Sequence, residues 1–157
     1  MLDYIKRVLI IIFINLIDQS FANFASDFLI ILPLTFLTYS FYVYKSDRNI
    51  DGIEAFSLGL FIDLISYSYF GLNAIIFCLI TYVINLYANA FKLFSYLQIC
   101  LFFGFSSTAY IGFTQLIINL YDFSYLTLFI SSISNIIFCI LVAIISTYLP
   151  KNIRMGT

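Results

Sequence analysis

Residues 124–149 read SYLTLFISSISNIIFCILVAIISTYL and contain no charged side chain. A run of about 20 apolar residues is long enough for a helix to cross the hydrocarbon core of a bilayer. Towards the N-terminus, five further apolar runs meet the same criterion, at residues 7–24, 28–45, 53–70, 72–91 and 95–119. The sequence therefore predicts one transmembrane domain, residues 1–157, folded as a compact all-α bundle of six membrane-spanning helices.

The composition agrees with a membrane protein and argues against several functions. The chain is 63% hydrophobic and 10% charged, with a mean hydropathy of +1.06, whereas soluble domains carry about 25% charged residues. A net charge of −1 without a basic tract argues against nucleic-acid binding. The chain has no histidine, which excludes Ser-His and Cys-His catalytic pairs and removes the commonest metal ligand. We therefore expect no enzymatic activity, cofactor or metal site, and we interpret Cys78, Cys100 and Cys139 as packing residues.

The basic residues predict the orientation in the membrane. They fall before the first run, between the second and third, between the fourth and fifth, and after the sixth: Lys6, Arg7, Lys45, Arg48, Lys92, Lys151 and Arg154. With six spans all of these positions lie on one side, which the positive-inside rule makes cytoplasmic together with both termini. The first run also resembles a signal peptide, but Asn23 fits poorly three residues before a cut after Ala25, so we expect a retained helix.

Asp63 is the most informative polar residue, because it lies about 15 Å into its span, near the bilayer midplane. An ionisable side chain at that depth is costly unless it is buried and partnered, and it is a functional-site hypothesis by default. Desolvation favours the neutral acid. Our hypothesis is that Asp63 is protonated and donates a hydrogen bond to Asn85, Gln19 or Gln115. Gly59, one turn earlier, would let a neighbouring backbone approach closely.

Asp18 and Gln19 raise the same question in the first span. Either this helix is short and both residues lie near its outer end, or they are buried polar residues with a function. The sequence leaves both interpretations open.

Small and polar residues form stripes at helical spacing on three spans. We interpret these stripes as helix-packing faces, with a pocket or a docking groove for another helix as the alternative. The stripes consist of Ala55, Gly59, Asp63 and Ser66; of Gly104, Thr108, Gly112, Gln115 and Asn119; and of Thr127, Ser131, Asn135, Cys139 and Ser146.

Residues 59–71, GLFIDLISYSYFG, resemble the signature of the rod shape-determining membrane protein family MreD. That signature is a glycine, three residues, an aspartate usually followed by leucine, and a second glycine eight residues after the aspartate. Gly59, Asp63, Leu64 and Gly71 match it, as do an amide near the end of span one (Gln19) and an acidic residue opening span two (Asp27). The chain departs from the family at Tyr67, where glycine is frequent, and at Ser26, where proline is favoured.

The resemblance implies a non-enzymatic component of the cell-elongation complex in the bacterial cytoplasmic membrane. Members pair with the bitopic protein MreC and through it connect MreB filaments to the glycosyltransferase RodA and its transpeptidase. It also implies a bundle similar to the substrate-binding subunits of energy-coupling-factor transporters, with Gly59, Asp63, Gly71, Gln19 and Asp27 shaping a pocket or a partner-docking surface. The alternative is a vitamin-transporter subunit, which the short, sparsely polar outer loops disfavour. Whether the chain forms a homodimer is left open.

Overall fold

The computed structural model describes residues 2–26, 29–46, 50–66, 69–118 and 124–148. These residues form helices and connections, and no strand occurs among them, so the all-α prediction is confirmed for the described chain. Each of the six predicted runs overlaps one long helix, and the fourth also contains a short one. The helices are α1 (Leu2–Ser26), α2 (Leu34–Lys45), α3 (Gly52–Ile65), α4 (Leu72–Leu86), α5 (Ala88–Phe91), α6 (Tyr96–Ile118) and α7 (Tyr125–Tyr148).

The second predicted span differs from the structure, because α2 begins only at Leu34. Pro33 precedes it, and a proline lacks the N–H that a continuing helix would use. Leu29 has a φ of 56°, a left-handed conformation that is rare for a branched side chain. Residues 29–33 are therefore a non-helical connection, which we call the strap.

Hydrogen bonds from α7 satisfy the backbone of the strap. The Ile31 N–H donates to Ser131 Oγ over 2.9 Å, and Asn135 Nδ2 donates to the Ile31 carbonyl over 3.0 Å. The Ser131 hydroxyl in turn donates to the Leu29 carbonyl over 3.4 Å. Non-helical backbone is tolerated at membrane depth only where the protein itself supplies such partners.

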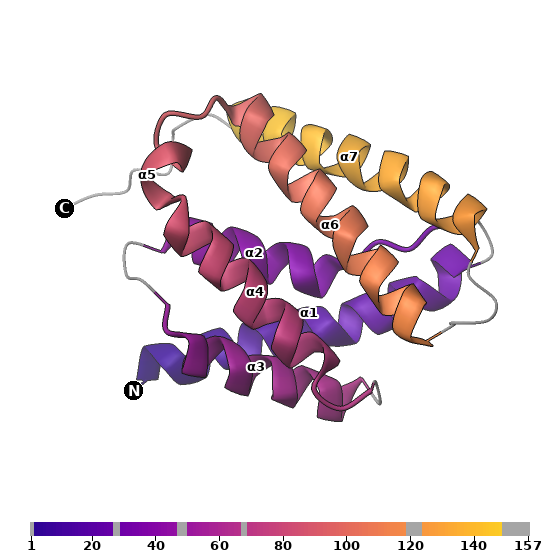
Figure 1. Cartoon of the computed structure of the whole chain (residues 1–157), viewed down its shortest axis with the longest axis horizontal. Coiled ribbons are helices and arrows are strands. Elements are labelled where there is room, and N and C mark those ends of the chain that lie inside the picture. Colours follow the sequence, from indigo (N-terminus) through magenta and orange to yellow (C-terminus); the bar gives the residue numbers. More distant parts are fainter. Residues whose placement is uncertain (1, 27–28, 47–49, 67–68, 119–123, 149–157) are drawn as a thin grey trace.

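The helices form antiparallel pairs that run back and forth along one axis (Figure 1). The start of α1, the end of α2, the short helix α5 and the end of α7 lie at the same end of the bundle. The basic residues near these helix ends, Lys45 at the last position of α2 and Lys92 directly after α5, therefore share one end of the molecule.

Two helix pairs pack along their lengths, α3 with α4 and α6 with α7. A Cβ on Gly104 would lie 2.8 Å from the side chain of Ile136 in α7, and one on Gly112 would lie 3.1 Å from Leu128. Thr108, between these glycines, donates a hydrogen bond to Ser132 over 3.0 Å. On α6 the stripe residues Gly104, Thr108 and Gly112 thus form a packing face, whereas Asn119 of the same predicted stripe lies outside the described residues.

Helix α2 lies at the centre of the fold and contacts α1, α4 and α6. Tyr39 of α2 is fully buried, stacks on Phe77 of α4 at a centroid distance of 4.1 Å, and shares a 2.7 Å hydrogen bond with Thr81. The cysteines are free thiols, with Cys100 and Cys139 buried and Cys78 partly buried.

Many large apolar side chains point outward, including Phe13, Phe105 and Phe129, each more than 60% exposed. In a bilayer such side chains face acyl chains. Among the described residues, α6 and α7 contain the segments that are long and apolar enough to cross a membrane, Leu97–Ile118 and Tyr125–Val142. Shorter apolar stretches lie in α1 (Val8–Ala22) and α4.

Candidate functional site

Asp63 caps the N-terminus of the helix that follows its own. Its Oδ2 accepts the N–H of Gly71 over 2.9 Å, and its Oδ1 accepts the N–H of Asn73 over 3.1 Å and the side-chain amide of Asn73 over 2.8 Å. The first N–H groups of an α-helix have no partner within the helix, and Gly71, at the N-cap of α4, has no side chain to offer. Asp63, only 2% exposed, supplies the missing acceptor from α3, and the helix dipole favours a negative group at this position.

The two glycines of the 59–71 segment make this cap possible. Gly71 has a φ of 92°, a left-handed conformation that glycine adopts without penalty. A Cβ on Gly59 would overlap the backbone of Ala74 and would lie 2.8 Å from the carbonyl carbon of Asn73. The first turn of α4 therefore rests directly on Gly59. Gly59, Asp63 and Gly71 belong to one structural unit, which we call the α3–α4 junction.

The hydrogen-bond partners of Asp63 differ from our hypothesis. All three described contacts are donations to its carboxyl oxygens, so Asp63 acts as an acceptor rather than as a donor. Asn85 instead donates to the Ile50 carbonyl, and Gln115 Oε1 is buried without a partner among the described residues. Backbone N–H groups of α4 are stronger competitors because they would otherwise remain unsatisfied in a buried position.

Asp18 plays the same role for α2. Its carboxyl oxygens accept the N–H of Leu34 over 3.2 Å, the N–H of Thr35 over 2.9 Å and the hydroxyl of Thr35 over 2.7 Å. Pro33 at the N-cap position again has no polar side chain. Because α1 continues to Ser26, Asp18 does not lie at the end of a short helix.

Gln19 and Asn15 connect the capped start of α2 with the end of α3. Gln19 Nε2 donates to Asn15 Oδ1 over 3.1 Å and to the Ile65 carbonyl, at the end of α3, over 3.4 Å. Ser66 donates to the same Asn15 oxygen over 3.1 Å, and Asn15 Nδ2 donates to the Thr35 hydroxyl over 3.3 Å. The predicted site residue Gln19 is thus close to the end of α3, whereas Asp27 lies outside the described residues.

Asn73 extends the junction to α6. The Tyr110 hydroxyl donates to Asn73 Oδ1 over 2.8 Å, and the Tyr110 ring stacks on Phe36 of α2 at a centroid distance of 4.7 Å. Sequence reasoning missed Asn15, Asn73 and Tyr110 as parts of this network. A usable signal was present: the starts of α2 and α4 carry proline and glycine rather than a capping side chain, so each needed an acceptor from elsewhere.

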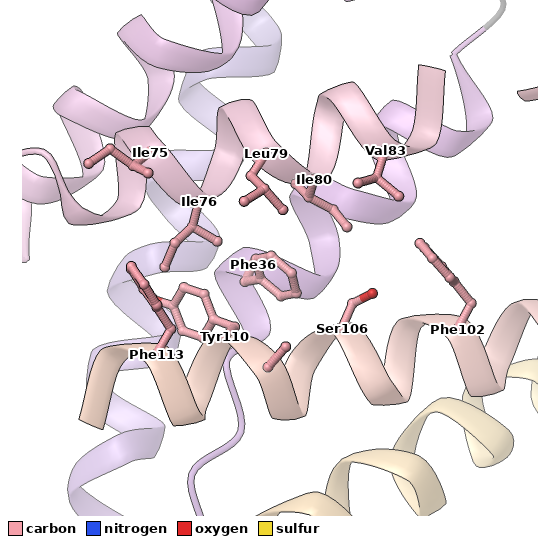
Figure 2. A pocket seen from close by; sticks show the side chains of 11 residues that line it. Phe36, Ile75, Ile76, Leu79, Ile80, Val83, Phe102, Ser106, Tyr110 and Phe113 are labelled. Carbon is pink, nitrogen blue, oxygen red and sulfur yellow. The ribbon is translucent and has the colours of Figure 1, made fainter. Parts of the chain in front are cut away.

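A groove lies beside Tyr110, between α4 and α6, with Phe36 of α2 at its base (Figure 2). Its volume is about 260 Å³, and apart from the Ser106 and Tyr110 hydroxyls its side chains are hydrocarbon. Among the described residues, no group of three or more Cys, Asp or Glu side chains could hold a metal ion. The polar atoms of the junction are hydrogen-bonded to one another. The groove could therefore hold an apolar group by its shape, but it presents no reactive side chains.

Comparison with known proteins gives one finding. The family model described as rod shape-determining protein MreD matches residues 3–150. No curated protein and no solved structure gave a significant match. Since the match covers nearly the whole chain, including the α3–α4 junction and the helices on both sides of the groove, the chain belongs to the MreD family of membrane proteins that determine rod shape.

Proposed function

We propose that this chain is a non-enzymatic component of the bacterial cell-elongation complex that binds MreC in the cytoplasmic membrane. Through MreC it would help connect MreB filaments with RodA and its transpeptidase, and so organise peptidoglycan synthesis. The observation that carries the proposal is the match of the MreD family over residues 3–150. No reactive pair of side chains in the α3–α4 junction or the groove competes with this interpretation among the described residues.

We propose six membrane crossings, by α1, α2 together with the strap, α3, α4, α6 and α7, with both termini in the cytoplasm. The back-and-forth course of the helices supports this arrangement (Figure 1). Lys45 and Lys92 lie at the end of the bundle where α1 begins and α7 ends. Basic residues gathered at one end are what the positive-inside rule requires of cytoplasmic connections.

In this proposal Gly59, Asp63, Gly71 and Gln19 determine the shape of the partner-binding surface without forming it. Asp63 and Gly59 are buried, and the polar atoms of Asp63 and Gln19 contact the protein's own helices. Their contribution is therefore to fix α4 against α3 and α3 against α1. Asp27 stays a proposed member of the site.

The test is purification through a C-terminal tag from native membranes in mild detergent, with mass spectrometry of the co-purified proteins. Recovery of a single-span coiled-coil protein together with cell-wall synthases is the expected result. Recovery of two ATPases and a helical coupling subunit would overturn the proposal and identify a vitamin-capture subunit.

A pair of variants sharpens the same experiment. Asp63→Asn is expected to reduce recovery of the partner because it removes part of the α4 cap. Asp51→Asn is the matched control, since Asp51 is exposed at the start of α3 and makes no side-chain capping bond. Equal loss of the partner in both variants would argue against a role for the junction in shaping the surface.

A further inference from the structure

The groove lies between two helix pairs, α3 with α4 and α6 with α7, and Phe36 of α2 lies at its base. Within each pair the backbones are in close contact, at Gly59 for α3 and α4 and at Gly104 for α6 and α7. Between the pairs, α4 and α6 touch only sparsely and leave the groove of about 260 Å³. Closely packed helix pairs move as units because their side chains have few alternative arrangements. The α4–α6 seam is therefore where the bundle can deform.

Little apolar driving force closes this seam in a bilayer, because lipid chains solvate an exposed Leu or Ile as well as a neighbouring helix does. Hydrogen bonds between the two helix pairs then supply a larger share of the energy that holds the seam closed. One such contact crosses the seam, the 2.8 Å hydrogen bond from the Tyr110 hydroxyl of α6 to Asn73 in the first turn of α4. The Asn73 side chain donates its own hydrogen bond to Asp63, so the acceptor of the Tyr110 bond is held in place.

Aromatic packing holds the first half of α6, about two turns before Tyr110. Phe103 lies against Phe41 and Tyr44 of α2 at centroid distances of 4.3 and 5.8 Å, and Phe102 lies against Phe91 of α5 at 4.8 Å. The bonds from α7 to the strap tie the α6–α7 pair to the start of α2, and they make no direct contact with α3 or α4. The α6–α7 pair thus has an aromatic pivot in the first half of α6 and the Tyr110–Asn73 bond about two turns further along the helix.

We propose that α6 and α7 move as one rigid pair against α3 and α4 about this aromatic pivot, and that the Tyr110–Asn73 hydrogen bond is a latch that sets the width of the α4–α6 groove. The latch is a conformational device of the fold and does not depend on the proposed function. Figure 2 shows Tyr110 beside the groove, with Ile76 of α4 on the opposite wall. Opening the latch would separate these two walls while each helix pair stays intact.

The test uses spin labels and distance measurement by pulsed electron resonance on the full chain in lipid nanodiscs, in a background without the native cysteines. Labels at Leu64 of α3 and Leu116 of α6, both more than half exposed, report across the seam. Labels at Leu116 and Leu126 report within the α6–α7 pair. Tyr110→Phe should broaden and lengthen the first distance distribution and leave the second unchanged.

Tyr39→Phe is the matched control, because it removes the same hydroxyl from a buried tyrosine whose 2.7 Å bond joins α2 to α4 away from the seam. It should leave the distribution between Leu64 and Leu116 as in the wild type. An unchanged distribution in Tyr110→Phe, or equal broadening in both variants, would overturn the latch.

Cross-linking in native membranes tests the same motion without purifying the protein. Ile75 and Phe113 face the groove from opposite sides and are replaced together by cysteine. A short bifunctional reagent should join them in the chain that retains Tyr110, and adding Tyr110→Phe should shift the yield to a longer reagent. Equal yields with both reagents in both chains would contradict the proposal.

Discussion

The α1–α2 and α3–α4 connections solve one physical problem in two ways. In both, a helix begins inside the bundle after a residue that cannot cap it, and an aspartate on the preceding helix supplies the acceptor. Asp63 is eight residues from Gly71 and acts across the short α3–α4 connection, whereas Asp18 is 16 residues from Leu34 and acts across the strap. Asp63 is almost fully buried and Asp18 only partly.

The two connections differ in whether contacts close in sequence are enough to hold them or a distant helix is also needed. The α3–α4 junction needs only its own two helices, because Gly59 lets them touch and Gly71 lets the chain turn. The α1–α2 connection also needs α7, whose Ser131 and Asn135 bind the strap. The four predictions below test this difference, from the largest expected effect to the smallest.

Gly59→Ala should have the largest effect. The new Cβ would overlap the backbone of Ala74, which cannot rotate away as a side chain could, so α3 and α4 must separate. Overpacking of this kind costs about 3 kcal/mol. Thermal unfolding in detergent, followed by circular dichroism, measures it. Gly52→Ala is the control and should melt as the wild type does, because none of the residues that the structure describes lies within 4 Å of the added Cβ.

Asp63→Asn should destabilise the protein more than Asp18→Asn. An asparagine in either place turns one accepting oxygen into a donor that faces backbone N–H groups. At the buried Asp63 the unmet groups cost about 2–3 kcal/mol, and at the partly exposed Asp18 about 1 kcal/mol. The same unfolding assay applied to both variants gives the ranking. A larger loss of stability for Asp18→Asn would mean that the cap of α2, and not the α3–α4 junction, is the more strongly stabilising of the two caps.

Ser131→Ala should lower stability by about 1 kcal/mol, because the Ile31 N–H loses its acceptor. The effect belongs to the strap, so combining Ser131→Ala with Asp18→Asn should give a non-additive loss, whereas combining it with Asp63→Asn should give an additive one. Ser134→Ala, also on α7, provides the baseline for removing a serine hydroxyl. Additivity in both double variants would show that α7 and Asp18 act independently on the strap.

Gly71→Ala should have the smallest effect. No described residue lies within 4 Å of the added Cβ, so the opposition to the substitution comes from the left-handed backbone at a φ of 92°. That conformation costs an alanine about 1 kcal/mol. Gly71→Asn should recover part of the loss, because asparagine adopts the left-handed region more readily. Equal stability of Gly71→Ala and the wild type would mean that the turn can relax to a negative φ.

The helices and the α3–α4 junction were predictable because their signals are local. Apolar runs of fixed length indicate helices, and Gly59, Asp63 and Gly71 lie within 13 consecutive residues. The later start of α2 was missed because the run 28–45 was judged by its length and hydropathy, which do not separate a helix from a strap that another helix satisfies. Pro33 was a local signal for a helix start in this run. The partners of Asp63 were missed because depth in the membrane indicates that a partner is needed without indicating which one. Tyr110 and Asn15 join the network through contacts 37 and 51 residues away in sequence, which no spacing pattern encodes.

The strap also has a consequence for the order of biosynthesis. Ile31 leaves the ribosome 100 residues before Ser131, the residue that satisfies its N–H. At about 5–20 residues per second, this interval is roughly 5–20 s. During that time the backbone of residues 29–33 has no acceptor or donor from α7 and must stay in contact with water, the insertion machinery or a chaperone. The first half of the chain therefore cannot reach its final packed arrangement in the membrane until the last helix has been made. A ribosome stalled before Ser131 should leave the strap accessible to proteases.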